Sequence, residues 1–179
     1  MNKALFLDRD GVINLDHGYV SRPEQFEFVD GIFNLCRAYH QAGYLLVVVT
    51  NQSGIGRGYY DEEQFARLTD WMKLQFEEEG APLAGVYFCP HHPSSARNGY
   101  LKDCDCRKPA PGMLLQAASE LNIELSWSVM VGDKVSDMQA AERAGVPTRY
   151  FLVHKKGCEV PKGSIAISSL SQLANRLQG

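Results

Sequence analysis

Three runs of apolar residues along the chain have the character of buried β-strands, and each is followed directly by polar side chains. Asp8 and Asp10 follow residues 5–7, Thr50 and Asn51 follow residues 47–49, and Asp133 follows residues 129–131. Open parallel sheets place their functional sites beyond the carboxyl ends of their strands. These polar groups are therefore predicted to converge on one site.

Strand-like and helical patterns alternate along the chain. Strands are predicted at residues 3–8, 44–50, 85–89, 128–132, 148–153 and 165–167, and helices at residues 31–42, 61–79, 111–122, 135–145 and 169–178. Such alternation is typical of βαβ units with right-handed crossovers. It predicts an α/β fold, namely a three-layer, Rossmann-like, mainly parallel sheet with helices on both faces.

Length and composition restrict the class of protein. A chain of 179 residues suits one domain, predicted to span residues 1–179, and 45% hydrophobic with 22% charged residues is ordinary for a soluble protein. The chain lacks both an apolar stretch long enough to span a membrane and a signal-peptide pattern. A net charge of -3 argues against a nucleic-acid partner. We therefore expect a cytoplasmic monomer with no membrane partner.

Asp8 and Asp10 are the first candidates for chemistry. Side chains two residues apart on a strand point the same way, so both carboxylates can reach one point past the strand end. Taken alone, the pair is more often two solvated acids in a turn. Lys108, just before a helix start marked by Pro109, offers a cation for the same site.

A second cluster of candidate ligands lies in the predicted loop 89–108. Cys89 and His91 form one close pair, and Cys104 and Cys106 form another. Three cysteines and one histidine are a common structural Zn²⁺ set, which leaves no open position for catalysis. A disulfide is the alternative, and a cytoplasmic chain disfavours it. We predict a Zn²⁺ loop, which would also direct residues 107–108 toward the site.

Taken together and in this order, these segments resemble the haloacid dehalogenase superfamily of phosphotransferases. Asp8-x-Asp10 is similar to its first motif, Thr50 to its second, Lys108 to its third, and residues 132–133 with Asp137 to its fourth. The resemblance implies that Asp8 attacks phosphorus to form an aspartyl-phosphate and that Asp10 is the general acid and base. It also implies that Thr50 and Lys108 donate to the phosphoryl oxygens.

The catalytic cofactor implied by the resemblance is Mg²⁺. Its predicted ligands are Asp8, the backbone carbonyl of Asp10, and Asp133, with Asp137 next to them. Oxygen-only donor sets of this kind suit Mg²⁺.

Spacing between the motifs leaves no room for an inserted cap domain. Among capless members, the cysteine and histidine loop resembles the D-glycero-D-manno-heptose 1,7-bisphosphate 7-phosphatases and the related histidinol-phosphate phosphatases. This implies a small phosphorylated sugar as substrate, with Arg107 recognising its second phosphate or its hydroxyl groups. Residues implied to line the substrate are Asp16, His17, Gly18, Tyr19, Asn51, Gln52, Ser53, Arg107 and Lys134. Gly54, Gly56 and Gly58 fit no phosphate-binding fingerprint and are interpreted as a flexible turn.

Three other functions are compatible with parts of this sequence. Histidinol-phosphate phosphatase shares the catalytic and Zn²⁺ residues, so only an assay separates it from the heptose bisphosphate reading. Polynucleotide 3′-phosphatases share the capless core, but the chain has no evident basic groove. A non-enzymatic, zinc-stabilised binding module would be favoured by the loss of Asp8 or Asp10, and both are present.

Overall fold

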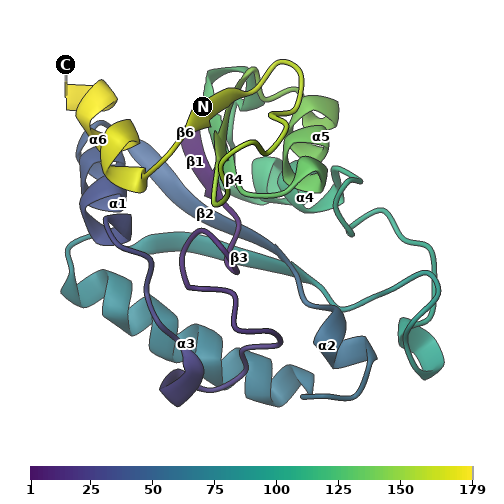
Figure 1. The fold of residues 1–179 in the computed structure, drawn as a ribbon. Coiled ribbons are helices and arrows are strands. Elements are labelled where there is room, and N and C mark those ends of the chain that lie inside the picture. Colours follow the sequence, from purple (N-terminus) through teal and green to yellow (C-terminus); the bar gives the residue numbers. More distant parts are fainter. Residues whose placement is uncertain (179) are drawn as a thin grey trace.

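All the strands of the described chain belong to one parallel sheet. The computed structural model describes residues 1–178, and its strand order is β3-β2-β1-β4-β5-β6 (Figure 1). The strands are β1 (Lys3–Leu7), β2 (Tyr44–Asn51), β3 (Leu83–Cys89), β4 (Val129–Gly132), β5 (Thr148–Leu152) and β6 (Ile165–Ile167). The predicted Rossmann-like α/β sheet is confirmed.

Helices cover both faces of the sheet, as predicted. They are α1 (Ile32–Gln41), α2 (Ser53–Gly56), α3 (Glu62–Glu78), α4 (Gly112–Leu121), α5 (Val135–Ala144) and α6 (Leu170–Gln178). Side chains of α1, α3 and α6 pack with Leu5 and Leu7 of β1, whereas side chains of α4 and α5 pack with Ala4 and Phe6. The period-2 alternation of β1 therefore supplies both hydrophobic cores.

The start of α3 illustrates how local sequence sets an element boundary. Asp61 Oδ1 accepts a hydrogen bond from the backbone N–H of Gln64 at 2.8 Å, and Gln64 Oε1 accepts one from the backbone N–H of Asp61 at 2.9 Å. This capping box satisfies two N–H groups that no helical carbonyl reaches. The helix then buries Phe65, Leu68 and Met72. Tyr60, which directly precedes the N-cap residue Asp61, contacts Gln52 just after the end of β2.

One interpretation of the sequence was wrong. The segment with Gly54 and Gly56 is not a flexible turn, because it forms the one-turn helix α2 and both glycines are buried. A Cβ at Gly54 would overlap the Tyr60 ring, and one at Gly56 would lie 2.6 Å from the carbonyl oxygen of Pro90. These glycines are needed for close packing. The sequence also left three short 3-10 turns unpredicted, at Pro23–Gln25, Asn98–Tyr100 and Leu125–Trp127.

The topology places the carboxyl ends of the central strands together. The strand order reverses between β1 and β4, which pair in parallel with Leu7 beside Val131. Ligands of open α/β sheets bind in the crevice outside such a switch point. None of the helices within residues 1–178 has the length and apolar character needed to span a membrane.

Candidate active site

A buried lysine between two buried aspartates forms the centre of the site. Lys108 Nζ lies 2.8 Å from Asp8 Oδ1 and 2.7 Å from Asp137 Oδ1, and it donates to the backbone carbonyl of Val49 at 2.9 Å. Burial alone lowers the pKa of Lys108, but the carboxylates of Asp137 and Asp8 outweigh it and the pKa is raised. Lys108 is therefore charged at neutral pH. The sequence places it 100 residues from Asp8, and the fold brings the two together.

Asp8, Asp133 and Asp137 form a carboxylate cluster with one oxygen from each within 4.8 Å of the others. Burial, and next the carboxylate of Asp137, raise the pKa values of both Asp8 and Asp133 above the ordinary range of aspartate. Lys108 alone therefore does not offset the cost of ionising these two buried carboxyl groups. A divalent cation would supply that charge.

Separate contacts distinguish the roles of the two aspartates that follow β4. Asp137 Oδ2 accepts the backbone N–H groups of Asp133 and Lys134, and its Oδ1 pairs with Lys108, so both oxygens are engaged. Asp133 contacts His154 Nε2 through Oδ2 at 3.2 Å, while its buried Oδ1 has no hydrogen-bond partner in residues 1–178. The free oxygen of Asp133 fits a metal ligand, and the occupied oxygens of Asp137 fit a supporting position.

Asp10 faces the pocket and is held by three side chains. Its Oδ1 accepts from Arg9 Nη2 at 2.9 Å and from Asn14 Nδ2 at 3.0 Å, and its Oδ2 accepts from Gln52 Nε2 at 3.0 Å. Asp10 is half-buried, whereas Arg9 is fully buried. The carboxylate is therefore oriented at the edge of the site but remains accessible.

The end of β2 connects the second and third predicted motifs. Asn51 Oδ1 accepts the backbone N–H of Lys108 at 3.0 Å, and Asn51 Nδ2 donates to the backbone carbonyl of Lys108 at 3.2 Å. This reciprocal pair positions the Lys108 backbone beside β2. The buried hydroxyl of Thr50 accepts from Gln52 Nε2 at 2.9 Å.

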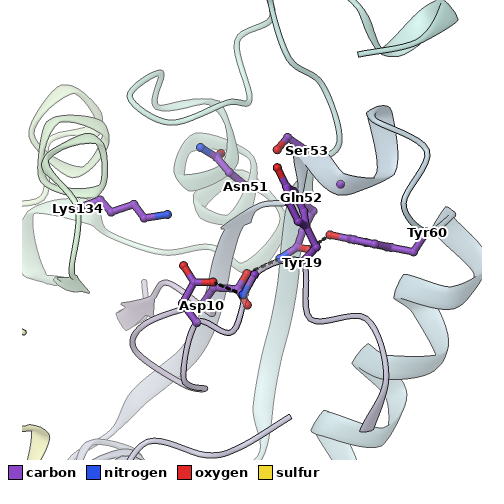
Figure 2. Close-up of a pocket in the computed structure, with 10 residues that line it drawn as sticks. Asp10, Tyr19, Asn51, Gln52, Ser53, Tyr60 and Lys134 are labelled. Carbon is purple, nitrogen blue, oxygen red and sulfur yellow. Dashed lines mark hydrogen bonds between the residues drawn. The ribbon is translucent and has the colours of Figure 1, made fainter. Parts of the chain in front are cut away.

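A cavity of about 310 Å³ opens beside Asp10, and most of the predicted substrate residues line it (Figure 2). These are Asp16, Gly18, Tyr19, Asn51, Gln52, Ser53 and Lys134; Gly54 and Tyr60 line it as well. Lys134 extends into the cavity from the side opposite Tyr60 (Figure 2). One wall thus carries the cation of Lys134, another carries hydroxyl and amide groups, and Asp10 and Asp16 add carboxylates that can accept from hydroxyl groups.

Two predicted substrate residues lie outside this cavity. His17 faces away, with Nε2 3.0 Å from Glu27 Oε2 on the exposed surface. Arg107 donates to the backbone carbonyl of His91 at 3.4 Å and lines a second hollow of about 280 Å³, which also borders Lys108 but shares no lining residue with the first. Lys108 therefore points into the site, whereas the neighbouring Arg107 points into a second hollow.

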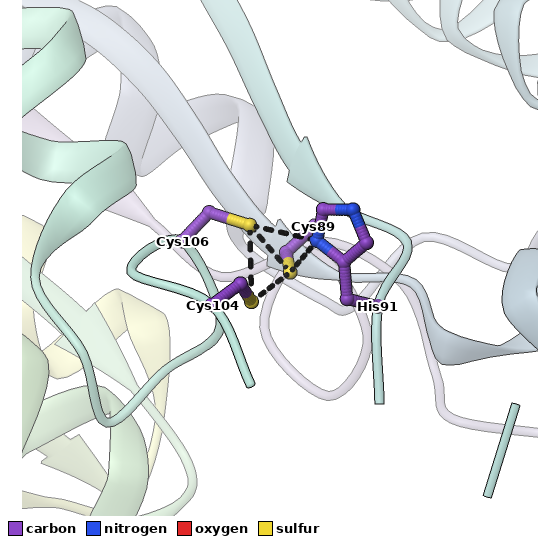
Figure 3. A group of neighbouring side chains, drawn as sticks. All are labelled: Cys89, His91, Cys104 and Cys106. Carbon is purple, nitrogen blue, oxygen red and sulfur yellow. Dashed lines mark hydrogen bonds between the residues drawn. The ribbon is translucent and has the colours of Figure 1, made fainter. Parts of the chain in front are cut away.

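The predicted zinc residues converge on one point (Figure 3). His91 Nδ1 lies 3.3 Å from Cys106 Sγ and 3.5 Å from Cys89 Sγ, and Cys104 Sγ lies 3.5 Å from Cys89 Sγ. All of these cysteines are free thiols. Burial is the first cause that raises the pKa of Cys89, and the hydrogen bond with Cys106 raises it further. Three sulfurs and one nitrogen around one point fit a tetrahedral Zn²⁺.

Sequence reasoning missed three residues of the site. Arg9 lies just beyond the end of β1, and its position between two candidate carboxylates was a signal that could have been read. His154 had no such signal, because it reaches the site from a loop 21 residues from Asp133, and Tyr60 had none, because an aromatic residue eight positions after Gln52 follows no strand or helix periodicity.

Known proteins similar to this chain define the class of enzyme to which it belongs. A family model described as HAD-hydrolase-like matches residues 105–157, which include Lys108, Asp133 and Asp137. A D-glycero-beta-D-manno-heptose-1,7-bisphosphate 7-phosphatase from Photorhabdus laumondii is 47% identical over 98% of this chain and 95% of the relative. A D-glycero-alpha-D-manno-heptose-1,7-bisphosphate 7-phosphatase from Burkholderia mallei is 52% identical over 93% of this chain and 88% of the relative.

A solved structure agrees with these relatives. The crystal structure of D,D-heptose 1,7-bisphosphate phosphatase from B. bronchiseptica, complexed with magnesium and phosphate, has a TM-score of 0.84 and 31% identity to this chain, and the match covers 98% of each. The chain therefore belongs to the heptose-1,7-bisphosphate 7-phosphatase family of HAD-like hydrolases.

Proposed function

We propose that this chain is a Mg²⁺-dependent phosphatase that removes the C7 phosphate of D-glycero-D-manno-heptose 1,7-bisphosphate through an aspartyl-phosphate on Asp8. The observation that carries the proposal is the buried Asp8 and Lys108 pair beside a cavity with Asp10 on its wall. The names of the relatives support the substrate. A cytoplasmic monomer acting on the pathway to the activated heptose of bacterial lipopolysaccharide core is the corresponding cellular role.

In the proposed reaction, a carboxylate oxygen of Asp8 attacks phosphorus while the bond to the C7 oxygen breaks. Asp10 gives its proton to the departing alkoxide. Water then attacks phosphorus of the aspartyl-phosphate, Asp10 takes a proton from it, and phosphate leaves with Asp8 regenerated. Thr50 and Lys108 donate to phosphoryl oxygens, where negative charge is greatest in the transition state.

Mg²⁺ would be held by Asp8, Asp133 and the backbone carbonyl of Asp10. When bound, it supplies the positive charge that lets an anionic carboxylate approach an anionic phosphate. Support for these ligands comes from the unpartnered Oδ1 of Asp133 and the raised pKa values of Asp8 and Asp133.

Selectivity for C7 follows from the shape of the site. Asp8 is buried and does not itself line the cavity, so a phosphate on an extended exocyclic arm would reach it more easily than one attached to the ring. The sugar would lie across residues 16–19, Ser53 and Lys134. We assign the anomeric phosphate to Arg107, whose guanidinium would exchange its long contact with the His91 carbonyl for a charge-assisted pair.

Arg107→Ala should separate recognition from chemistry. We expect kcat/KM for the heptose bisphosphate to fall on the order of 100-fold, with a change of less than about threefold on a small generic monophosphate. The measurement is phosphate release, with phosphorus NMR of the product. Arg67→Ala, at a surface arginine paired with Glu63, is the charge-matched control.

A heptose 1-phosphate product supports the proposal. A heptose 7-phosphate product, or equal losses on both substrates in Arg107→Ala, would contradict it. Histidinol phosphate and fructose 1,6-bisphosphate belong in the same screen, because preference for histidinol phosphate would point to the related phosphatase activity. Activity that survives removal of Mg²⁺ by EDTA would contradict the cofactor assignment.

We further propose that Cys89, His91, Cys104 and Cys106 hold a structural Zn²⁺. The ion would anchor a long loop that contains only one short 3-10 turn, at Asn98–Tyr100. Because Cys106 directly precedes Arg107, the ion would also set the direction of residues 107–108. Support comes from four ligand atoms within 4.8 Å of one another.

Cys104→Ser is expected to lower the Zn²⁺ content from about one ion per chain toward zero and to reduce activity indirectly. Elemental analysis and phosphate-release assays measure the two effects. Cys158→Ser, at an exposed thiol outside the cluster, is the matched control and should keep both wild-type values. Wild-type protein without zinc, or with a disulfide among the cluster cysteines, would refute the assignment.

A further inference from the structure

We propose that Tyr60 is a positioning residue for the acid–base chemistry of Asp10 and that it acts through the side-chain amide of Gln52. The inference rests on the proposed function, because it takes Asp10 as the group that protonates the leaving alkoxide. Tyr60 lies between α2 and α3, on the cavity wall opposite Lys134 (Figure 2).

The amide of Gln52 is the link between Tyr60 and the catalytic groups. Gln52 Nε2 donates to Asp10 Oδ2 at 3.0 Å and to Thr50 Oγ1 at 2.9 Å, while Gln52 Oε1 accepts from the hydroxyl of Tyr60 (Figure 2). Both amide protons and the carbonyl oxygen thus have partners. A side-chain amide has no further donors, so both N–H groups of Gln52 are used in these two hydrogen bonds.

Only one orientation of the amide satisfies these partners. If the amide were reversed, Oε1 would face the carboxylate oxygen of Asp10, and two acceptors would be opposed. The side chains of Gln52 and Tyr60 are 2% and 6% exposed, so solvent does not readily replace the hydroxyl. Burial raises the pKa of Tyr60 to about 12, so its hydroxyl keeps its proton at neutral pH and remains a donor.

Tyr60 is itself held rigidly. Its ring packs with Ile55 and Phe65 in a small hydrophobic cluster and lies so close to Gly54 that no Cβ fits there. The capping box of Asp61 fixes the following residue. The hydroxyl is therefore presented from a rigid frame. Without it, the amide of Gln52 loses the partner of its carbonyl and can rotate, which leaves Asp10 Oδ2 without a donor.

The chemistry of the leaving group provides a selective test. A primary alkoxide leaves poorly without a proton, so hydrolysis of an alkyl phosphate depends on a correctly oriented Asp10. A p-nitrophenolate ion leaves without one. A loss of the correct Asp10 orientation should therefore lower kcat/KM more for the alkyl phosphate than for p-nitrophenyl phosphate. General damage to the site would lower kcat/KM for both substrates alike.

The variant Tyr60→Phe keeps the ring and removes the hydroxyl. We expect kcat/KM for a primary alkyl phosphate to fall about tenfold, mainly through kcat, and that for p-nitrophenyl phosphate to change less than about twofold. Tyr100→Phe is the matched control, because Tyr100 packs against the same cluster and donates its hydroxyl to Glu62 at 2.8 Å. It should leave both values unchanged.

A double-mutant cycle tests whether Tyr60 acts through Gln52. In a Gln52→Leu background, Tyr60→Phe should cause no further loss on the alkyl substrate. Equal losses on both substrates in Tyr60→Phe, or additive losses in the cycle, would overturn the inference. If Tyr60→Phe gives no cooperative thermal transition, the test rests on the Gln52→Leu variant alone. Equal losses of kcat/KM on the alkyl and p-nitrophenyl substrates in Gln52→Leu would then overturn the inference. Wild-type protein inactive on every phosphate ester would instead overturn the proposed function.

Discussion

Asp8→Asn is expected to lower multiple-turnover phosphatase activity on the order of 10⁴-fold or more, because it removes the nucleophile while keeping nearly the same volume. Asparagine cannot accept the phosphoryl group at a useful rate. Steady-state phosphate release with saturating Mg²⁺ measures the effect. Asp70→Asn, at an exposed position on α3, is the isosteric control and should retain wild-type activity.

Asp8→Asn should not be less stable to unfolding than the wild type. Burial and Asp137 raise the pKa of Asp8, so its ionised form costs folding free energy as pH rises from about 3.9 to the folded-state pKa. Without Mg²⁺ at pH 7, we expect Asp8→Asn to melt at or above the wild-type temperature, and we expect this advantage to disappear near pH 4. Near wild-type turnover in purified Asp8→Asn would exclude the covalent mechanism.

Lys108→Met is expected to have the second large effect, on both activity and stability. It removes a donor to the phosphoryl oxygens, and it leaves the buried carboxylates of Asp8 and Asp137 without their cation. We expect kcat to fall on the order of 10³-fold. The free energy of unfolding should fall by about 3–5 kcal/mol at neutral pH without Mg²⁺. Urea unfolding with EDTA measures the second effect.

The stability loss in Lys108→Met should depend on pH. As the pH falls from neutral, the raised pKa of Asp8 lets its carboxyl take up a proton earlier than an ordinary aspartate, so the loss should become smaller. Lys134→Met is the stability control, because Lys134 has no ion pair with a carboxylate in residues 1–178, and it should unfold like the wild type. An unchanged urea midpoint in Lys108→Met would show that the buried pair contributes little.

Much of the fold could be predicted from the sequence because its elements are encoded locally. Apolar runs marked the strands, and most boundaries agree within two residues; β3, for example, begins at Leu83 and was expected at residue 85. The short helix α2 was missed, since four residues with two glycines carry no helical periodicity. Those glycines are explained by close contacts with residues distant in the chain, among them Tyr19 at Gly54 and Pro90 at Gly56.

The composition of the candidate site was also accessible from the sequence. Acids after parallel strands converge by topology alone, and the spacing of Cys89, His91, Cys104 and Cys106 already suggested one metal. The directions of the side chains around the cavity could not be predicted from the sequence in the same way. His17 turns to Glu27, and Arg107 lines a second hollow, although both neighbour residues that face the site.

By itself, the sequence determined the order of the strands and helices and the chemical groups at the strand ends, because hydrophobic periodicity and residue type act over a few neighbouring positions. The tertiary structure alone decided the Lys108 pairing with Asp8 and Asp137, the contact of His154 with Asp133, and the Tyr60 contact with Gln52. The first two contacts depend on where loops from separate βα units meet in space, whereas Tyr60 and Gln52 both lie in the connection between β2 and α3 and meet through its folded shape. No local pattern encodes that meeting, since its geometry is set by packing of both hydrophobic cores.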